Sequence, residues 1–86
     1  MTATRQDIER WIKEAQQQKA THLVVVVDRY DHENYPVYVL PGEDVKKKCE
    51  SYLRGENMQG VDEIYSFTGK YSVASQLAEH RARHFD

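Results

Sequence analysis

Ionisable and aromatic side chains crowd one short stretch, residues 28–35, which reads Asp-Arg-Tyr-Asp-His-Glu-Asn-Tyr. Carboxylates and an imidazole this close could bind a divalent ion. However, the spacing of a calcium loop is absent, and metal sites generally gather ligands from several elements. Tyrosine and arginine are favoured anchors at interfaces, so a recognition loop stands beside the plainer interpretation of a solvated turn. The candidate ligand-binding residues here are Asp28, Arg29, Tyr30, Asp31, His32 and Tyr35, and no metal site is assigned.

A second group of candidates lies in the last third of the chain. Ser66–Ser72 has the Gly-Lys of a phosphate loop, but Tyr71 stands where that loop needs Ser or Thr. Lys70 and the start of a following helix could still hold an anion, and a plain helix cap is the alternative. For a nucleotide, phosphates would pair with Arg29, Lys70 or Arg81, and bases would stack on Tyr30, Tyr35 or Tyr71.

His80 and His84 are four residues apart, which on a helix would bring their side chains together. The pattern of a zinc protease needs Glu directly after the first His, and here Arg81 follows. We therefore favour two boundary or solvent-facing histidines. A small metal-dependent hydrolase is the alternative, and it would use Asp28, Asp31, His32, His80 and His84. No cofactor is expected, and the single cysteine, Cys49, is interpreted as a buried small hydrophobe.

Length and charge bound the class of protein. The 86 residues predict a single domain, 1–86, and 12 basic against 14 acidic residues give a net charge of −2. A binder of nucleic acid would carry a basic excess, so nucleic acid is an unfavoured partner. A nucleic-acid-binding accessory factor using Lys46–Lys48 remains a third hypothesis. The absence of a long apolar window, the lack of an export signal and the lone thiol predict a cytoplasmic protein without membrane contact.

Periodicity and caps predict six elements around this chemistry. Thr4 and Asp7 form a helix start, and Ile8, Trp11, Ile12 and Ala15 follow at helical spacing. The apolar run Leu23–Val27 does not alternate, so both faces of that strand should be covered. We expect a helix over about Arg5–Lys19, strands over Thr21–Asp28, Tyr35–Leu40 and Val61–Phe67, a helix opening at Pro41–Asp44 and stopping at Gly55, and a last helix over about Ser72–His84.

The order α-β-β-α-β-α predicts an α+β fold with a three-stranded antiparallel sheet in the order 2-1-3, packed with helices. Three strands span roughly 14 Å, which two helices already cover. One helix must therefore cross to the other face, or a second subunit must cover it. For this reason we also expect a homo-oligomer.

Four segments carry a resemblance: Ala20–Asp28, Tyr35–Val39, Pro41–Asp44 and Asn57–Gln59. Together they resemble small uncharacterised proteins of bacteria, prophages and phages. That family has no settled activity, so the resemblance implies no catalytic residue. It implies a compact accessory protein that acts by occupying something in a host cell.

The main functional hypothesis is a non-enzymatic, phage-type accessory binding protein, acting in inhibition of host defence. It would sequester either a host protein or a small anionic ligand such as a signalling nucleotide. No catalytic constellation is visible, and a sequestering protein needs affinity without turnover.

Overall fold

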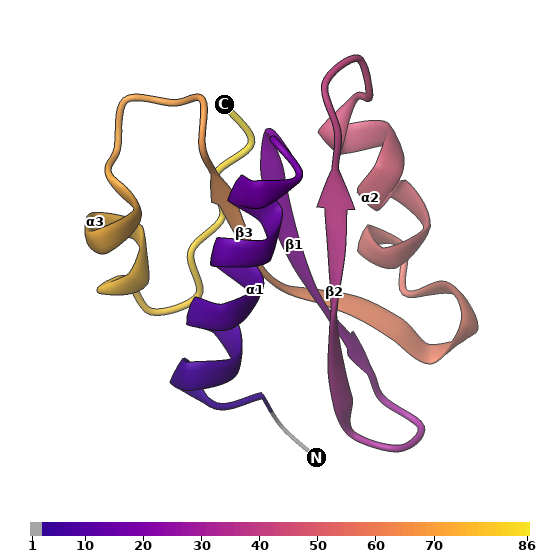
Figure 1. Ribbon diagram of the computed structural model, residues 1–86. Coiled ribbons are helices and arrows are strands. Elements are labelled where there is room, and N and C mark those ends of the chain that lie inside the picture. The colour runs from indigo at the N-terminus through magenta and orange to yellow at the C-terminus, as the bar shows by residue number, and fades with distance from the viewer. Residues whose placement is uncertain (1–2) are drawn as a thin grey trace.

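The computed structural model describes residues 3–86. In chain order the elements are α1 (Arg5–Gln17), β1 (His22–Asp28), β2 (Glu33–Val39), α2 (Val45–Leu53), the 3₁₀ turn η1 (Glu56–Met58), β3 (Gln59–Ser66) and α3 (Val73–Leu77) (Figure 1). The first helix and all three strands begin and end within two residues of their predicted positions. The predicted α+β class is therefore confirmed.

Side-chain caps fix where the two longer helices begin. At α1 the Thr4 hydroxyl accepts from Asp7 N (3.1 Å), and the Asp7 carboxylate accepts from Thr4 N (2.9 Å). At α2 the Asp44 carboxylate accepts from Lys46 N (2.9 Å) and Lys47 N (3.2 Å). Each cap satisfies amide groups that have no partner inside the helix.

The sheet has the predicted order β2-β1-β3, with β1 antiparallel to both neighbours. Antiparallel pairing on both sides of β1 places the β1–β2 turn and the start of β3 at the same end of the sheet, because Asp28 pairs with both Glu33 and Gln59. A register shift against β3 falls between Val25 and Val26.

Both faces of β1 are covered within one chain, as the unbroken apolar run predicted. Leu23 and Val25 pack into a cluster with α1, whereas Val24 and Val26 pack into a second cluster with α2. Figure 1 shows the two helices on opposite sides of the sheet. All four side chains are at most 1% exposed, and each such burial stabilises the fold by about 1.5–3 kcal/mol. α1 and α2 therefore cover opposite faces of the sheet, which is the first of the two arrangements predicted from its width.

The prediction of one long helix over Ser72–His84 is wrong, because α3 ends at Leu77. Arg81 has a φ of 60°, in the left-handed region that a right-handed helix excludes. The following residues lie along β3 instead: Ile64 N donates to Ala82 O (2.8 Å), and His84 N donates to Ile64 O (3.1 Å). Hydrogen bonds to β3 therefore determine the conformation of this segment, although the spacing of its apolar residues favours a helix.

This pairing changes the positions of several residues that the last helix would have carried. His80 lies in the turn after α3, and His84 lies on the segment that follows beside β3, so the two residues are not one helical turn apart. Phe85 packs in the α2-side cluster, whereas Leu77 packs in the α1-side cluster, so the two residues do not share a face. Ala74 and Ala78 are exposed.

The two outer edges of the sheet differ. The C-terminal segment lies along the outer edge of β3, as Figure 1 shows. β2 forms the other edge, and Pro36 lies in its middle, opposite Val25. A proline fits in a sheet where its nitrogen faces away from the neighbouring strand, so the missing N–H belongs to the free edge. Within residues 3–86 no helix is long and apolar enough to span a bilayer.

Candidate functional site

The β1–β2 turn is held in shape by its own side chains. The Asp28 carboxylate accepts from Tyr30 N (2.9 Å), and the Asp31 carboxylate accepts from Glu33 N (3.2 Å). His32 adopts a left-handed φ of 59°, which completes the reversal of the chain. These are the local aspartate turns that order a short loop, so both predicted carboxylates have a structural task.

A second loop, after α2, lies against this turn. Arg29 N donates to Met58 O (2.8 Å), and Arg29 Nη1 donates to Gln59 O (3.1 Å). A Cβ placed on Gly60 would lie 2.5 Å from Arg29 Nη2, so the guanidinium rests directly on that glycine. Arg29 therefore joins the two loops through its backbone N–H and one guanidinium nitrogen. We call the combined surface the hairpin end; it consists of residues 28–33 and 55–58.

Backbone strain is concentrated at the hairpin end. Of the five non-glycine residues with positive φ in residues 3–86, three lie here: His32, Asn57 and Met58. Left-handed backbone is costly for a side chain such as that of methionine, and strained residues gather where function requires a particular shape. The surface is therefore fixed in a conformation that local propensity does not favour.

Large apolar side chains project from this strained scaffold. Tyr30 is 81% exposed and Met58 is 54% exposed. Leu53, at the end of α2 beside this surface, is 47% exposed. Met58 was not among the predicted site residues. The strand order could have found it, because antiparallel pairing brings the start of β3 to the β1–β2 turn.

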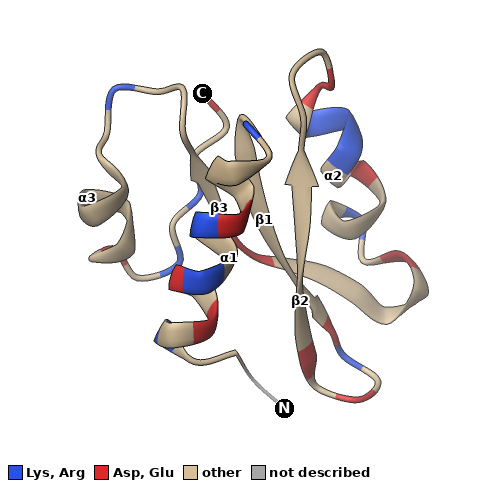
Figure 2. Ribbon diagram, viewed as in Figure 1, with Lys and Arg blue, Asp and Glu red and all other residues tan. Residues whose placement is uncertain are grey.

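The hairpin end is acidic. It carries four acidic residues, Asp28, Asp31, Glu33 and Glu56, against one arginine. Figure 2 shows the acidic positions on the two adjacent loops. Because like charges repel, this surface disfavours a phosphate or another anion and favours a cationic partner.

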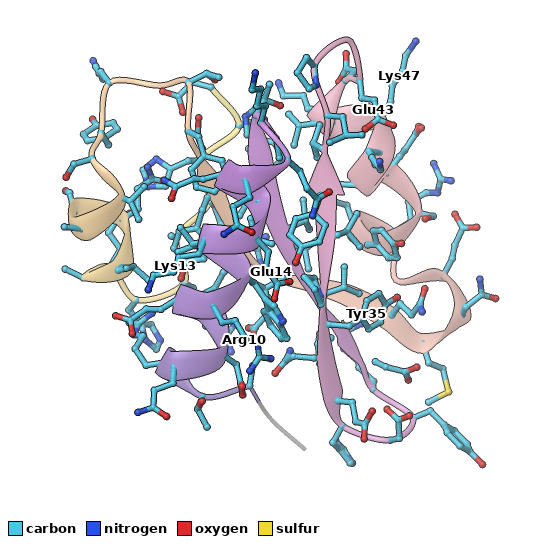
Figure 3. The ribbon with its side chains drawn as sticks, viewed as in Figure 1. Arg10, Lys13, Glu14, Tyr35, Glu43 and Lys47 are labelled. Atoms are coloured by element: carbon cyan, nitrogen blue, oxygen red, sulfur yellow. The ribbon has the colours of Figure 1, made fainter. Side chains whose placement is uncertain are left out.

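Tyr35 lies just inside the hairpin end and is partly buried. Its ring packs in the α2-side cluster, and its hydroxyl accepts from Gln59 Nε2 (2.7 Å). Figure 3 shows the side chain over the sheet rather than at the loop tip. Burial, followed by a nearby tyrosine, raises the pKa of Tyr35. The residue braces β2 against β3 and offers little ring surface to a base.

Lys70 and Tyr71 lie at the opposite end of the sheet. They follow β3, whose last residue Ser66 pairs with His22 at the start of β1, so roughly 20 Å of strand separates them from the hairpin end. The Lys70 ammonium lies 5.7 Å from the Tyr71 ring centroid, and the Tyr71 and His84 rings are 5.3 Å apart. The nine predicted ligand-binding residues therefore do not converge on one site.

The start of α3 carries a side-chain cap of its own, the alternative weighed against an anion site there. The Ser72 hydroxyl accepts from Ser75 N (3.1 Å). The fully buried Gln76 side chain donates to Ser66 O (2.8 Å) and Tyr71 O (3.0 Å) and accepts from Ser66 N (2.8 Å). These bonds attach the loop between β3 and α3 to the end of β3. Hydrophobic periodicity along the chain did not indicate them.

The groups proposed for metal chemistry are dispersed. His84 Nε2 lies 2.7 Å from Glu79 Oε2, whereas Asp28, Asp31 and His32 belong to the hairpin end. In the part of the chain that the structure describes, no three His, Cys, Asp or Glu side chains are placed to hold a metal ion. Cys49 is buried as predicted, and burial raises the pKa of its thiol to about 11, which keeps it protonated at neutral pH.

Comparison with known proteins finds no matching family model, no matching curated protein and no matching solved structure.

Proposed function

We propose that this chain is a non-enzymatic binding protein that holds a protein partner at the hairpin end. The observation that carries the proposal is Tyr30, an aromatic side chain 81% exposed at the tip of a turn held by side-chain hydrogen bonds. An exposed tyrosine on a rigid loop binds at low entropic cost and is a frequent hot spot. The exposed Met58 beside it adds an adaptable apolar contact.

The acidic residues of the hairpin end define the partner further. Four carboxylates on the same surface as two exposed apolar side chains match a partner that combines basic residues with an apolar pocket. In keeping with the resemblance to phage and prophage proteins, the partner would be a host protein that is sequestered. Sequestration of a nucleotide is less favoured here, because the only arginine of the surface is engaged with Gln59 O and the net charge is negative.

Site-specific cross-linking tests this proposal. A photoreactive phenylalanine analogue is placed at Tyr30 and, as a matched control, at Tyr71, which is 49% exposed at the other end of the sheet. We expect one defined protein to cross-link from position 30 and not from position 71. Equal cross-linking from both positions would contradict a role for the hairpin end.

Calorimetry with that purified protein gives the quantitative test. We expect Tyr30→Ala to weaken binding by a factor of about 30 or more, as for a hot spot of 2 kcal/mol or above, and Tyr71→Ala to leave it unchanged. Affinity should fall as salt rises, because the surface is charged. An unaltered affinity in Tyr30→Ala would refute the proposal.

The small-ligand version has its own test. Titration with cyclic and linear nucleotides should give no heat of binding. If a nucleotide binds saturably and this binding is lost in Arg29→Gln, the ligand of the hairpin end is an anionic small molecule and not a protein.

A further inference from the structure

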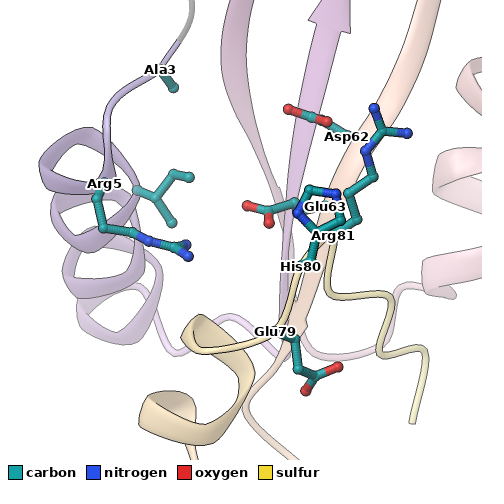
Figure 4. Close-up of a pocket in the computed structure, with 8 residues that line it drawn as sticks. Ala3, Arg5, Asp62, Glu63, Glu79, His80 and Arg81 are labelled. Carbon is teal, nitrogen blue, oxygen red and sulfur yellow. The ribbon is translucent and has the colours of Figure 1, made fainter.

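A cleft of about 270 Å³, lined by none of the hairpin-end residues, lies between the start of α1 on one side and β3 with the C-terminal segment on the other. Ala3 and Ile8 provide its apolar part. Figure 4 shows the remaining side chains, which are all ionisable: Arg5, Asp62, Glu63, Glu79, His80 and Arg81.

Glu63 is the buried acidic group of this cleft. The residue is only 8% exposed, and its Oε1 accepts from the Tyr65 hydroxyl (2.6 Å). Its Oε2 makes no hydrogen bond in residues 3–86, and no wholly buried side-chain oxygen in that range lacks a partner. Oε2 must therefore reach the open surface of the cleft. A carboxylate so far removed from water gains strongly from a cationic partner.

Arg5 supplies the opposite charge from the facing wall. Its Nη1 donates to the Tyr65 hydroxyl (3.4 Å), so Tyr65 links the arginine to Glu63 across the floor. In Figure 4 the guanidinium extends from α1 toward the wall formed by β3. This chain of hydrogen bonds holds two opposite charges apart instead of pairing them.

Two further charged side chains of the cleft, those of Asp62 and Arg81, can contact a ligand. Glu79 is paired with His84, but within the described residues the side chains of Asp62 and Arg81 make neither a hydrogen bond nor an ion pair. Arg81 lines the cleft, and its backbone has a left-handed φ of 60°. Charges of both signs therefore face one small space without neutralising each other.

We propose that this cleft binds a small zwitterion of the α-amino-acid class. The ligand's ammonium group would pair with Glu63 and Asp62, and its carboxylate with Arg5 and Arg81. The volume supports the choice, because sites for drug-sized ligands occupy about 300–1,000 Å³ and a nucleotide would be too large. None of the residues that line this cleft belongs to the hairpin end, so this proposal does not depend on the proposed protein partner.

The test is a titration of the 86-residue chain with L-alanine, L-leucine, L-lysine and L-glutamate, followed by two-dimensional NMR. Propylamine and propionate serve as probes that each carry a single charge. We expect at least one amino acid to bind with a Kd of about 1 mM or below, and both single-charge probes to bind at least about 10-fold more weakly.

Three variants locate the binding. Glu63→Gln keeps the shape and the Tyr65 hydrogen bond but removes the charge, and we expect about a 10-fold loss of affinity or more. Asp62→Asn, on a half-buried residue, repeats the test should Glu63→Gln fail to fold. Arg10→Gln is the matched control on α1, outside the cleft, and should leave affinity unchanged.

Two results would overturn the proposal. If no amino acid shifts the signals of the residues lining the cleft, there is no such site. If propylamine binds as tightly as the amino acids, the cleft recognises a cation alone.

Discussion

Gln76 shows how a single side chain can fasten a loop. Its amide makes three hydrogen bonds to the backbone of Ser66 and Tyr71 while remaining fully buried. We expect Gln76→Leu to lower the free energy of unfolding by about 3 kcal/mol, because buried amide and carbonyl groups of Ser66 would lose their partners. Urea denaturation measures the loss, and the exposed neighbour Ser75→Ala is a control for the helix itself. A loss within experimental error would show that water replaces the amide.

His22 should make stability depend on pH. It is 6% exposed, and burial lowers its pKa below the ordinary value of 6.5, although the bond to Phe85 O opposes this. The unfolded chain therefore takes up a proton first as the pH falls. The stabilisation is complete above pH 6.5 and is lost as the pH drops toward the folded-state pKa.

The measurement is the unfolding free energy between neutral pH and about pH 5, above the range in which carboxylates titrate. We expect the wild-type chain to lose stability across this range, and His22→Gln to lose less. Parallel curves for the two proteins would contradict the assignment.

At the scale of elements, the loop before β3 combines strain with exposure. Met58 has a φ of 60°, which costs a non-glycine residue about 1 kcal/mol, and its side chain is mostly exposed. We expect Met58→Gly to raise the unfolding free energy by up to about 1 kcal/mol while weakening capture of the partner that cross-links at Tyr30. Met58→Ala is the control, because it removes the side chain and keeps the strain. If Met58→Gly is destabilised, the left-handed backbone is not a source of strain.

β2 is an edge strand whose pairing is limited by Pro36. Since proline removes a backbone donor from the free edge, we expect Pro36→Val to promote association through this strand. Sedimentation at increasing protein concentration would detect it, with Val37→Thr as a control on the same strand. A Pro36→Val protein that sediments like wild type would show that another feature protects the edge.

Elements governed by local rules were predictable from the sequence, and those governed by distant pairing were not. The Thr4–Asp7 cap and the Leu23–Val27 run act within one element, and both behave as expected. The segment His80–Phe85 looks helical by spacing, but its backbone bonds to Ile64 outweigh that tendency. The candidate site divides in the same way: Tyr30 lies in a loop visible from composition, whereas the neighbouring Met58 becomes apparent only from strand order.

At the scale of the whole molecule, one chain buries both faces of its sheet. We therefore expect the midpoint of thermal unfolding to be independent of protein concentration, because helices of the same chain already cover both faces of the sheet. Calorimetric scans over a wide concentration range check this. A midpoint that rises with concentration would show that association stabilises the fold and would support the homo-oligomer expected from the sequence.

The end of the chain is tied down far from Tyr30. Thr68 Oγ1 donates to Asp86 O (2.9 Å), and the Asp86 carboxylate lies against Gly69, at the end of the sheet opposite the β1–β2 turn. A linker joined after Asp86 would therefore leave the molecule on the side remote from the tyrosine tip. Protein attached to a sensor or bead by such a linker should display that tip outward, whereas attachment ahead of Ala3, whose N–H bonds to Asn34 near the turn, would crowd it.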